Sequence, residues 1–220
     1  MIFNDTTELE KHLADKADRE ITKQIDTIDY TKQNFPNNRS YLMLSAHQIK
    51  HLNRLDRYLA DTVIINLEDG VAPSVKKSAR ALAALFISRL NKRKNRIVVR
   101  VNPLDKGGIE DIALMNTVKP DAIRVAKIST VQEAKQAVEL INNDIEIHFS
   151  IETAEAFHNL AALRCDKRIT TYYLGILDLL ADLHLSQSII SISNPTFLTI
   201  LSQFLLQCKI TAIHPVGFTY

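Results

Sequence analysis

The chain has 220 residues, of which 46% are hydrophobic and 24% charged, and its formal net charge is +2. This length is enough for one α/β domain with a substantial core, and the composition excludes a disordered or fibrous protein. The small net charge gives no electrostatic reason to expect a nucleic-acid partner. The basic stretch 92–96, Lys-Arg-Lys-Asn-Arg, is expected to be a solvated loop.

The sequence carries no sign of export, membrane insertion or disulfide bonding. Its N-terminus has an early acidic residue and lacks the apolar segment of a secretory signal. No apolar stretch approaches the roughly 20 residues needed to cross a bilayer. Cys165 and Cys208 lack the spacing of a metal site or a disulfide framework. We therefore expect a cytoplasmic protein with no membrane partner.

The first predicted element is an amphipathic helix over residues 6–28, where apolar residues recur every three or four positions. This helix could cap the bottom of a barrel, or it could be an addition that meets a partner. A polar break at 33–38 follows it. We therefore divide the chain into an N-terminal helix and linker, residues 1–38, and a main domain, residues 39–220.

Strands and helices alternate from residue 40 onward. The predicted strands are 40–44, 61–68, 96–102, 122–128, 145–152, 170–177 and 210–216, and the predicted helices are 48–59, 74–90, 109–117, 130–141, 154–163 and 194–207. Thr130 and Glu133 have the spacing of a capping box, and Asn194 with Pro195 starts the last helix. This alternation indicates right-handed crossovers and a parallel sheet.

The glycine content distinguishes between two folds that share this alternation. An open dinucleotide-binding sheet would show a glycine-rich turn, and the 5 glycines form no GxGxxG pattern. We therefore predict an α/β fold of the TIM-type (β/α) barrel class. Seven strands are recognised rather than eight, so the barrel is expected to be incomplete.

Charged residues follow four of the apolar strand segments. Glu68 and Asp69 follow one segment, and Arg100, Glu152 and Asp178 end or follow three others. In (β/α) barrels the chemistry lies at the carboxyl ends of the strands, so we expect these side chains at one rim. Mg²⁺ prefers carboxylate oxygens, and arginine offers a planar fork for a carboxylate ligand. The pattern therefore indicates a site for a metal and a carboxylate.

Each candidate also has a purely structural interpretation. The pair at 68–69 could cap a loop, Arg100 could be an ion-pair partner, and Glu152 could interact with a helix dipole. Lys127 could contact an anion or form a salt bridge at the barrel rim. His47, in the first loop, could be a substrate contact or have no role.

Six short motifs occur in order from residue 39 onward. They are Arg-Ser-Tyr-Leu at 39–42, Ile-Ile-Asn-Leu-Glu-Asp-Gly-Val at 64–71, Val-Arg-Val-Asn-Pro at 99–103, Val-Ala-Lys-Ile at 125–128, Ile-Glu-Thr-Ala at 151–154 and Gly-Ile-Leu-Asp-Leu at 175–179. Together they resemble the citrate lyase beta-subunit family, which includes citryl-, malyl- and citramalyl-thioester lyases. The resemblance implies magnesium-dependent cleavage or formation of a carbon–carbon bond between a small oxo or hydroxy acid and a thioester of CoA or an acyl carrier.

The resemblance also implies a role for each matched residue. Glu152 and Asp178 correspond to direct ligands of Mg²⁺, and Arg100 corresponds to the clamp on the substrate carboxylate. Glu68 and Asp69 would orient water on the metal, so with Arg100 they form the expected catalytic set. We add Lys127 and His47 to Arg100 as candidate substrate-binding residues.

The sequence also departs from the family pattern. The tripeptide Ser-Ala-His at 45–47 replaces a Pro-Gly-Asn-like turn, Asn66 replaces an aspartate, Ala126 replaces a proline, and Ile-Leu at 176–177 replaces Ala-Glu. We recognise no eighth strand and no C-terminal segment of the kind that family has. These changes affect the thioester half of the site more than the metal half.

Three functions therefore stay open. The first is a magnesium-dependent C–C lyase-like protein. The second is a degenerate, non-catalytic subunit that binds metal and a keto acid, and the third is a class II pyruvate-type aldolase. An incomplete barrel leaves strand edges exposed, so a homo-oligomer is also expected.

Overall fold

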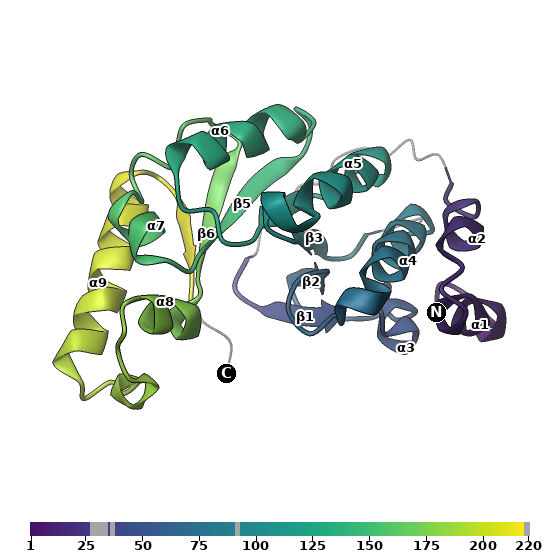
Figure 1. Ribbon diagram of the computed structural model, residues 1–220, viewed down its shortest axis with the longest axis horizontal. Coiled ribbons are helices and arrows are strands. Elements are labelled where there is room, and N and C mark those ends of the chain that lie inside the picture. The colour runs from purple at the N-terminus through teal and green to yellow at the C-terminus, as the bar shows by residue number, and fades with distance from the viewer. Residues whose placement is uncertain (27–34, 36–37, 91–92, 218–220) are drawn as a thin grey trace. The chain divides into compact units, whose positions relative to one another are not determined.

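The computed structural model describes residues 1–26, 35, 38–90 and 93–217 (Figure 1). The chain divides into two compact units, one of residues 1–102 and 107–123 and one of residues 103–106 and 124–220. The division predicted between residues 38 and 39 stays a prediction. No helix in the described ranges is long and apolar enough to cross a membrane.

The first unit contains three parallel strands, which are β1 (Tyr41–Ser45), β2 (Thr62–Asn66) and β3 (Arg96–Val101). They pair in this order, with Ser45 opposite Asn66 and Asn66 opposite Arg100. Every residue of the middle strand, β2, is buried, as in parallel sheets that are covered on both faces. The register therefore places three polar residues in a row at the carboxyl ends of the strands.

Short and long helices surround these strands. They are α3 (Ile49–Leu52), η1 (Pro73–Val75), α4 (Lys76–Ser88) and α5 (Gly108–Val118). Nine of the 13 residues of α4 are buried, four of them alanines, so this helix packs closely. The helix predicted at 48–59 is wrong beyond α3, because the chain continues as turns from Asn53.

The N-terminal segment forms two short helices, α1 (Thr7–Ala14) and α2 (Asp18–Thr22), instead of the single predicted helix. The helix breaks at Lys16, whose φ of 53° lies in the left-handed region. Both helices belong to the first unit, where α2 packs on α4 and Ile21 is fully buried. Phe3 meets Phe86 of α4 edge-on, with ring centroids 5.1 Å apart.

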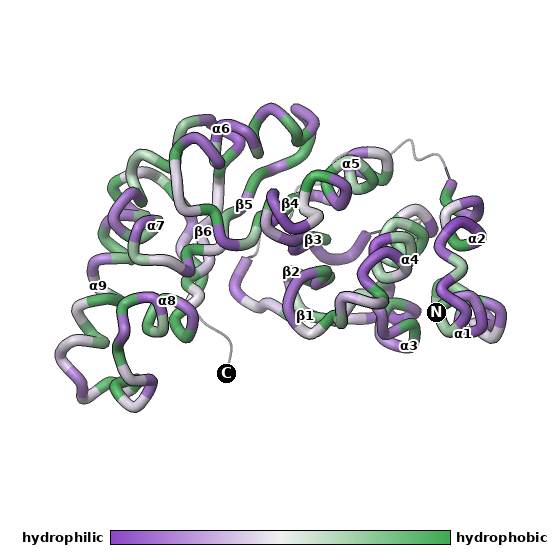
Figure 2. Tube along the Cα trace, in the orientation of Figure 1, coloured by the Kyte–Doolittle hydropathy of each residue, from purple (hydrophilic) through white to green (hydrophobic). Residues whose placement is uncertain are grey.

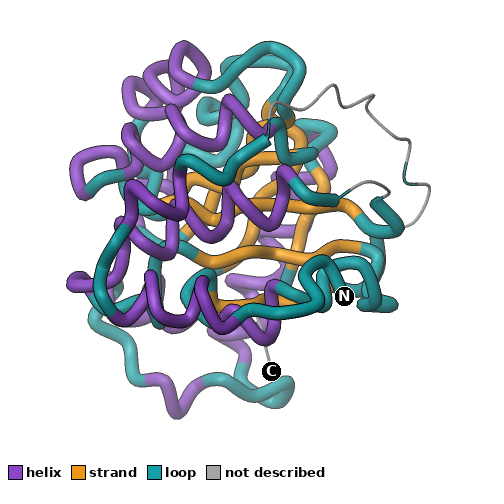
Figure 3. The backbone as a smooth tube through the Cα atoms, turned by 90° about the vertical axis from the view of Figure 1, so that its right-hand side faces the viewer, coloured by secondary structure: helices purple, strands orange, loops and turns teal. Residues whose placement is uncertain are grey.

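The second unit contains the parallel strands β5 (Glu146–Ile151), β6 (Ile169–Leu174) and β7 (His214–Val216), which pair in this order. Strand β4 (Ala122–Val125) has residues in both units. The helices of the second unit are η2 (Leu104–Lys106), α6 (Val131–Leu140), α7 (Ala154–His158), α8 (Ile176–Asp182), η3 (Gln187–Ile189) and α9 (Pro195–Ile210). Figure 2 shows hydrophobic and hydrophilic stretches alternating along the helices, and Figure 3 shows helices and strands in different colours.

The predicted alternation is confirmed, with seven strands among the described residues. The capping box of Thr130 and Glu133 and the cap at Asn194 are also confirmed. Helix α8 was missed, because the apolar run after β6 continues the strand's own pattern and periodicity cannot separate them. As a result β6 ends at Leu174, not at residue 177.

The described part of the basic stretch, residues 93–96, is not the solvated loop that was predicted for 92–96, and Lys92 lies outside the described residues. Arg93 and Asn95 are buried, and the Arg93 guanidinium lies 3.4 Å from the carboxylate of Asp121. Asn95 donates hydrogen bonds to two backbone carbonyls. Lys94 is exposed and Arg96 is partly exposed. Arg93 and Asn95 therefore anchor the chain just before β3, which charge counting alone does not reveal.

Candidate functional site

Arg100, Glu68 and Asp69 form one ion-pair cluster in the first unit, which we call the Arg100 cluster. The Nη2 atom of Arg100 lies 2.7 Å from Glu68 Oε2 and 3.2 Å from Asp69 Oδ2. The side chains of Arg100 and Glu68 are 7% and 6% exposed, and that of Asp69 is 61% exposed. The structure therefore brings these three predicted residues together, although β2 ends at Asn66 and the two acids lie on the loop after it.

Asn66 shapes this loop. Its side-chain amide donates to the carbonyl of Asp69, and its side-chain oxygen accepts from the amide of Glu68 at 3.1 Å. An ionised aspartate could supply the acceptor but not the donor. Gly70, with φ of 78°, completes the turn, since few other residues adopt this conformation. Asn66, noted only as a departure from a family pattern, thus has a clear structural role.

Lys76 and Asn102 form hydrogen bonds to the backbone of the same loop, and neither was predicted as a site residue. The ammonium group of Lys76, at the start of α4, donates to the carbonyls of Leu67 at 3.1 Å and Glu68 at 3.0 Å, and to the side chain of Asn102. The Asn102 amide also donates to the carbonyl of Leu67 at 3.2 Å. One cation therefore ties together the chain segments that follow β2 and β3.

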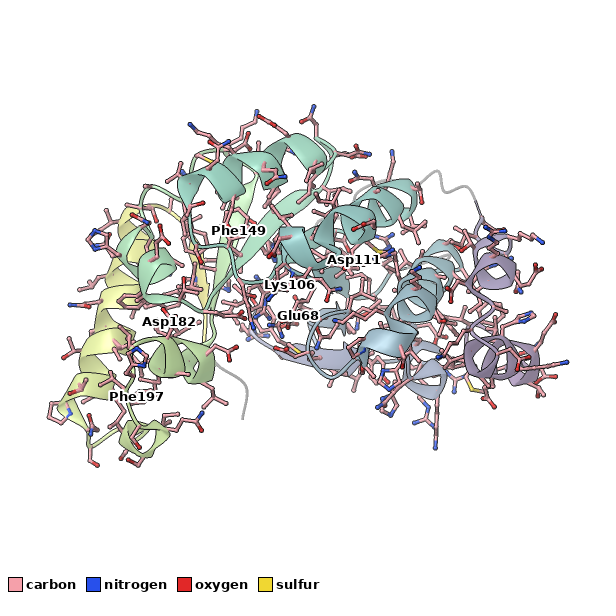
Figure 4. All side chains as sticks on the ribbon, in the orientation of Figure 1. Glu68, Lys106, Asp111, Phe149, Asp182 and Phe197 are labelled. Carbon is pink, nitrogen blue, oxygen red and sulfur yellow. The ribbon has the colours of Figure 1, made fainter. Side chains whose placement is uncertain are left out.

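Asp111, on α5, anchors Asn102 in turn. The fully buried Asp111 carboxylate accepts from Asn102 N at 3.0 Å, from Asn102 Nδ2 at 2.6 Å and from Arg80 Nε at 2.6 Å. Glu68 and Asp111 are both labelled in Figure 4. Hydrogen bonds to an ionised acceptor are stronger than neutral ones, so Asp111 is central to this network.

Burial raises the pKa of Glu68 to about 7. The side chain of Asp69 adds to this rise in the pKa of Glu68, whereas the positive charge of Arg100 and the hydrogen bond from the backbone amide of Asp69 oppose it. The pKa of Glu68 thus lies near neutrality, where a carboxyl group can both hold and release a proton.

This raised pKa predicts a pH dependence of stability. The folded state holds the Glu68 proton more firmly than the unfolded state does. The stabilising contribution of Glu68 to the free energy of unfolding is therefore complete below about pH 4.5, and it is lost as pH rises through about 7. The free energy of unfolding should therefore fall between pH 5 and 8 more steeply in the wild type than in Glu68→Gln, by up to about 3 kcal/mol. Urea titrations across this range measure the difference. Glu110→Gln, at an exposed position, is the control, and superimposable profiles for wild type and Glu68→Gln would contradict the assignment.

The structure places His47 and Lys127 in different units. His47 is half-buried after β1, with Nδ1 2.9 Å from the hydroxyl of Ser45, and that hydroxyl donates to the carbonyl of Gly70 at 3.2 Å. His47 therefore belongs to the same group of loops as Asp69. Lys127 is exposed and follows β4 with φ of 54°. Contact of either residue with a substrate stays a prediction.

Glu152 is the buried acid of the second unit. It is 3% exposed and follows β5 directly, as predicted. The next two residues fix the backbone here, because Thr153 caps α7 by accepting from Ala156 N at 3.1 Å, and Ala154 N donates to the Asp182 carboxylate at 2.7 Å. Asp182 is labelled in Figure 4. The carboxylate of Glu152 is thus presented from a rigid turn.

Gly175 provides the space that the Glu152 side chain occupies. The amide of Gly175 donates to the carbonyl of Ile151 at 2.9 Å, so its backbone passes close to Glu152. A Cβ atom on Gly175 would lie 2.4 Å from Glu152 Cγ, too near for any side chain. Asp178 follows three residues later and is exposed in the first turn of α8. Its predicted place directly after a strand was wrong, since α8 begins at Ile176.

Gly175→Ala should therefore both destabilise the protein and displace Glu152. Overpacking of this kind costs about 1–3 kcal/mol in unfolding free energy, which urea unfolding measures. Gly217→Ala is the matched control, because nothing lies within 4 Å of a Cβ at that position. Equal stability of the two variants would show that Glu152 can move aside without cost.

The donor chemistry around Glu152 suits a hard divalent cation. Among the residues that the structure describes, no three His, Cys, Asp or Glu side chains cluster in a way that could hold a metal. Zinc sites need three or four such ligands, whereas Mg²⁺ takes one or two carboxylates and keeps several waters. A buried glutamate packed against Gly175, with an exposed aspartate three residues after that glycine in the first turn of α8, is a donor set of the kind that Mg²⁺ takes.

Comparison with solved structures shows the fold class of this chain. The chain resembles the citrate lyase beta subunit of Mycobacterium tuberculosis solved with oxaloacetate and magnesium, with a TM-score of 0.62 and 21% identity over 80% of this chain and 76% of that one. Protein CitE of the same organism, in complex with magnesium, acetoacetate and coenzyme A, gives a TM-score of 0.66 and 21% identity, covering 84% of this chain and 66% of that one. These likenesses confirm the predicted α/β, TIM-barrel-type fold class.

The family follows from the sequence. Residues 39–216 match the family described as HpcH/HpaI aldolase/citrate lyase, and the chain belongs to this family. A (3S)-malyl-CoA thioesterase of Cereibacter sphaeroides is 30% identical over 146 residues, which make up 66% of this chain. The match spans 51% of that relative, so this chain covers about half of its length.

Proposed function

We propose that this chain is a magnesium-dependent carbon–carbon lyase of small oxo or hydroxy acids, including their CoA thioesters. The observation that carries the proposal is the buried Glu152 carboxyl group, whose side chain packs so closely against Gly175 that a Cβ atom there would lie 2.4 Å from Glu152 Cγ. Relatives solved with magnesium, oxaloacetate and coenzyme A support it. The expectation that all candidate side chains share one rim stays a prediction, as do cytoplasmic location and a homo-oligomer.

In this proposal Glu152 and Asp178 hold the metal. Bound Mg²⁺ would act as a Lewis acid toward the oxygen of an oxo or hydroxy acid. Glu152 is held by its buried turn, and Asp178 projects from the first turn of α8. Because only two carboxylates hold the metal, its other coordination positions would be taken by water and by an oxygen of the bound acid.

The Arg100 cluster supplies recognition and a proton site. Arg100 presents a planar, permanently charged fork, which matches a carboxylate better than an ammonium group does. Glu68, with a pKa near neutrality, can hold a proton beside it. Asp69 shares the Arg100 guanidinium, so both acids keep the fork oriented.

Calorimetry tests the metal assignment. Oxaloacetate and pyruvate should bind more tightly with Mg²⁺ than without it, and both Glu152→Gln and Asp178→Asn should weaken Mg²⁺ binding. These variants remove a charge and keep the shape of the side chain. Unchanged Mg²⁺ affinity in both variants would overturn the proposal.

Arg100→Lys tests the carboxylate assignment, because lysine keeps the charge and loses the fork. We expect oxo-acid binding to weaken by about 1–3 kcal/mol, the range for a hydrogen bond to a charged group, while Mg²⁺ binding alone is retained. Isothermal titration at a fixed Mg²⁺ concentration measures both. If Arg100→Lys binds the acid as firmly as the wild type, Arg100 is a structural ion-pair residue.

Hydrolysis of a thioester is a second candidate function. The observation that favours it is the similarity to a (3S)-malyl-CoA thioesterase at 30% identity. The two reactions give different products from malyl-CoA, since a lyase forms acetyl-CoA and glyoxylate whereas a thioesterase releases malate and free CoA. Binding of metal and acid without either reaction would favour the non-catalytic subunit, and turnover of free oxo acids alone would favour the aldolase.

A further inference from the structure

A buried arginine that the proposed function does not use lies beside Glu152. Arg124, on β4, is 6% exposed, and its Nη2 atom lies 4.0 Å from Glu152 Oε1. Both residues belong to the second unit. A guanidinium group remains protonated in proteins, so this is a permanent positive charge next to a buried carboxylate.

Neighbouring side chains fix the guanidinium in place. Arg124 Nε donates to the hydroxyl of Ser150 at 2.7 Å, and its guanidinium carbon lies 4.1 Å from the centroid of the Tyr173 ring. The Tyr173 hydroxyl lies 3.3 Å from Nδ1 of the buried His148, so the ring is held as well. A hydrogen bond and a cation–π contact thus keep the positive charge at its distance from Glu152.

The sum of charges changes what the site can bind. Two carboxylates, from Glu152 and Asp178, would neutralise a divalent cation by themselves. When the positive charge of Arg124 is counted as well, the site with Mg²⁺ bound carries a net charge of +1. An anionic ligand that arrives with the metal removes this excess, so the arrangement favours metal and acid together over metal alone.

We propose that Arg124 is a positioning residue for Glu152 whose charge makes the site bind Mg²⁺ weakly alone and more firmly with an anionic oxo acid. This inference rests on the proposed function, because it requires Mg²⁺ at Glu152. It concerns how strongly the binding of Mg²⁺ and the binding of the oxo acid depend on each other, which the metal ligands Glu152 and Asp178 alone do not determine.

Isothermal titration of Mg²⁺ with and without pyruvate tests it on the full chain. Arg124→Met removes the charge and keeps the length of the side chain, so Mg²⁺ alone should bind roughly fivefold more tightly and most of the gain from pyruvate should disappear. Arg124→Lys keeps the charge and should retain the gain. An unchanged or weaker affinity for Mg²⁺ alone in Arg124→Met would overturn the inference.

Three further variants separate charge from packing. Ser150→Ala removes the hydrogen bond to Arg124 without changing charge, so Mg²⁺ affinity should stay within about twofold. Arg164→Met removes an exposed arginine of the same unit and should change nothing. If Arg124→Met fails to fold in a thermal melt, Arg124→Gln keeps a donor for Ser150 and carries the same test.

The two proposals can fail separately. If the wild type binds no Mg²⁺, the proposed function fails and the role of Arg124 fails with it. If the wild type binds Mg²⁺ through Glu152 and Arg124→Met shows the same affinity and the same gain from pyruvate, only the assignment of Arg124 fails.

Discussion

Asp111→Ala should destabilise the first unit by about 3–5 kcal/mol, the cost of breaking a buried ion pair by removing one partner. The Asp111 carboxylate accepts three hydrogen bonds, two from Asn102 and one from Arg80. Its loss leaves the Arg80 charge and the Asn102 amide without this acceptor. Because most domains have only 5–15 kcal/mol of stability, the variant should show a large shift in urea midpoint.

Two variants give this prediction its control. Glu110→Ala changes an exposed acid one position earlier on α5, and it should alter stability by no more than about 0.5 kcal/mol. Asp111→Asn keeps the shape and one acceptor oxygen, so its loss should be intermediate. If Asp111→Ala lowers the free energy of unfolding by less than about 1 kcal/mol, water replaces the carboxylate and the network does not hold the end of β3.

The fold could be predicted because its signals are local. Buried parallel strands such as β2 and β3 contain unbroken β-branched runs, at 62–65 and 97–99, and caps such as Asn194 mark helix starts by residue type. The predicted bounds of an element were wrong where a strand and the helix after it share one apolar pattern. The apolar run after Leu174 continues the strand, and only packing reveals that α8 begins at Ile176. The break at Lys16 required a left-handed residue that composition does not indicate.

The site was predictable only in part, for a physical reason. Glu68, Arg100 and Glu152 are charged residues at the ends of apolar strands, so sequence position alone marks them as unusual. Lys76, Asp111 and Arg124 contact Asn102, Arg80 and Glu152, which lie more than 25 residues away in the chain, at separations that no periodic pattern encodes. Gly175 was also missed as a site residue. Its importance lies in the missing Cβ, which becomes visible only once Glu152 is placed against it.

Glu152→Gln should reduce any turnover of malyl-CoA by this chain by roughly 10²–10³-fold, the range for losing one preorganised electrostatic group at a reacting oxygen. The amide keeps the volume of the side chain in the space beside Gly175, so the fold should be preserved. The neutral oxygen is a poorer ligand for a hard cation than a carboxylate is. A thermal melt equal to that of the wild type separates loss of chemistry from loss of structure.

The assay should follow both products, because glyoxylate reports carbon–carbon cleavage and a free thiol reports thioester hydrolysis. If both activities fall together in Glu152→Gln, one metal serves both reactions. Glu155→Gln, which alters the exposed acid in the first turn of α7, three residues after Glu152, is the matched control and should keep wild-type turnover. Wild-type turnover that stays undiminished in Glu152→Gln would remove the metal from the mechanism. In that case the Arg100 cluster, with Glu68 poised near neutral pH, would be the remaining candidate for the acid–base chemistry.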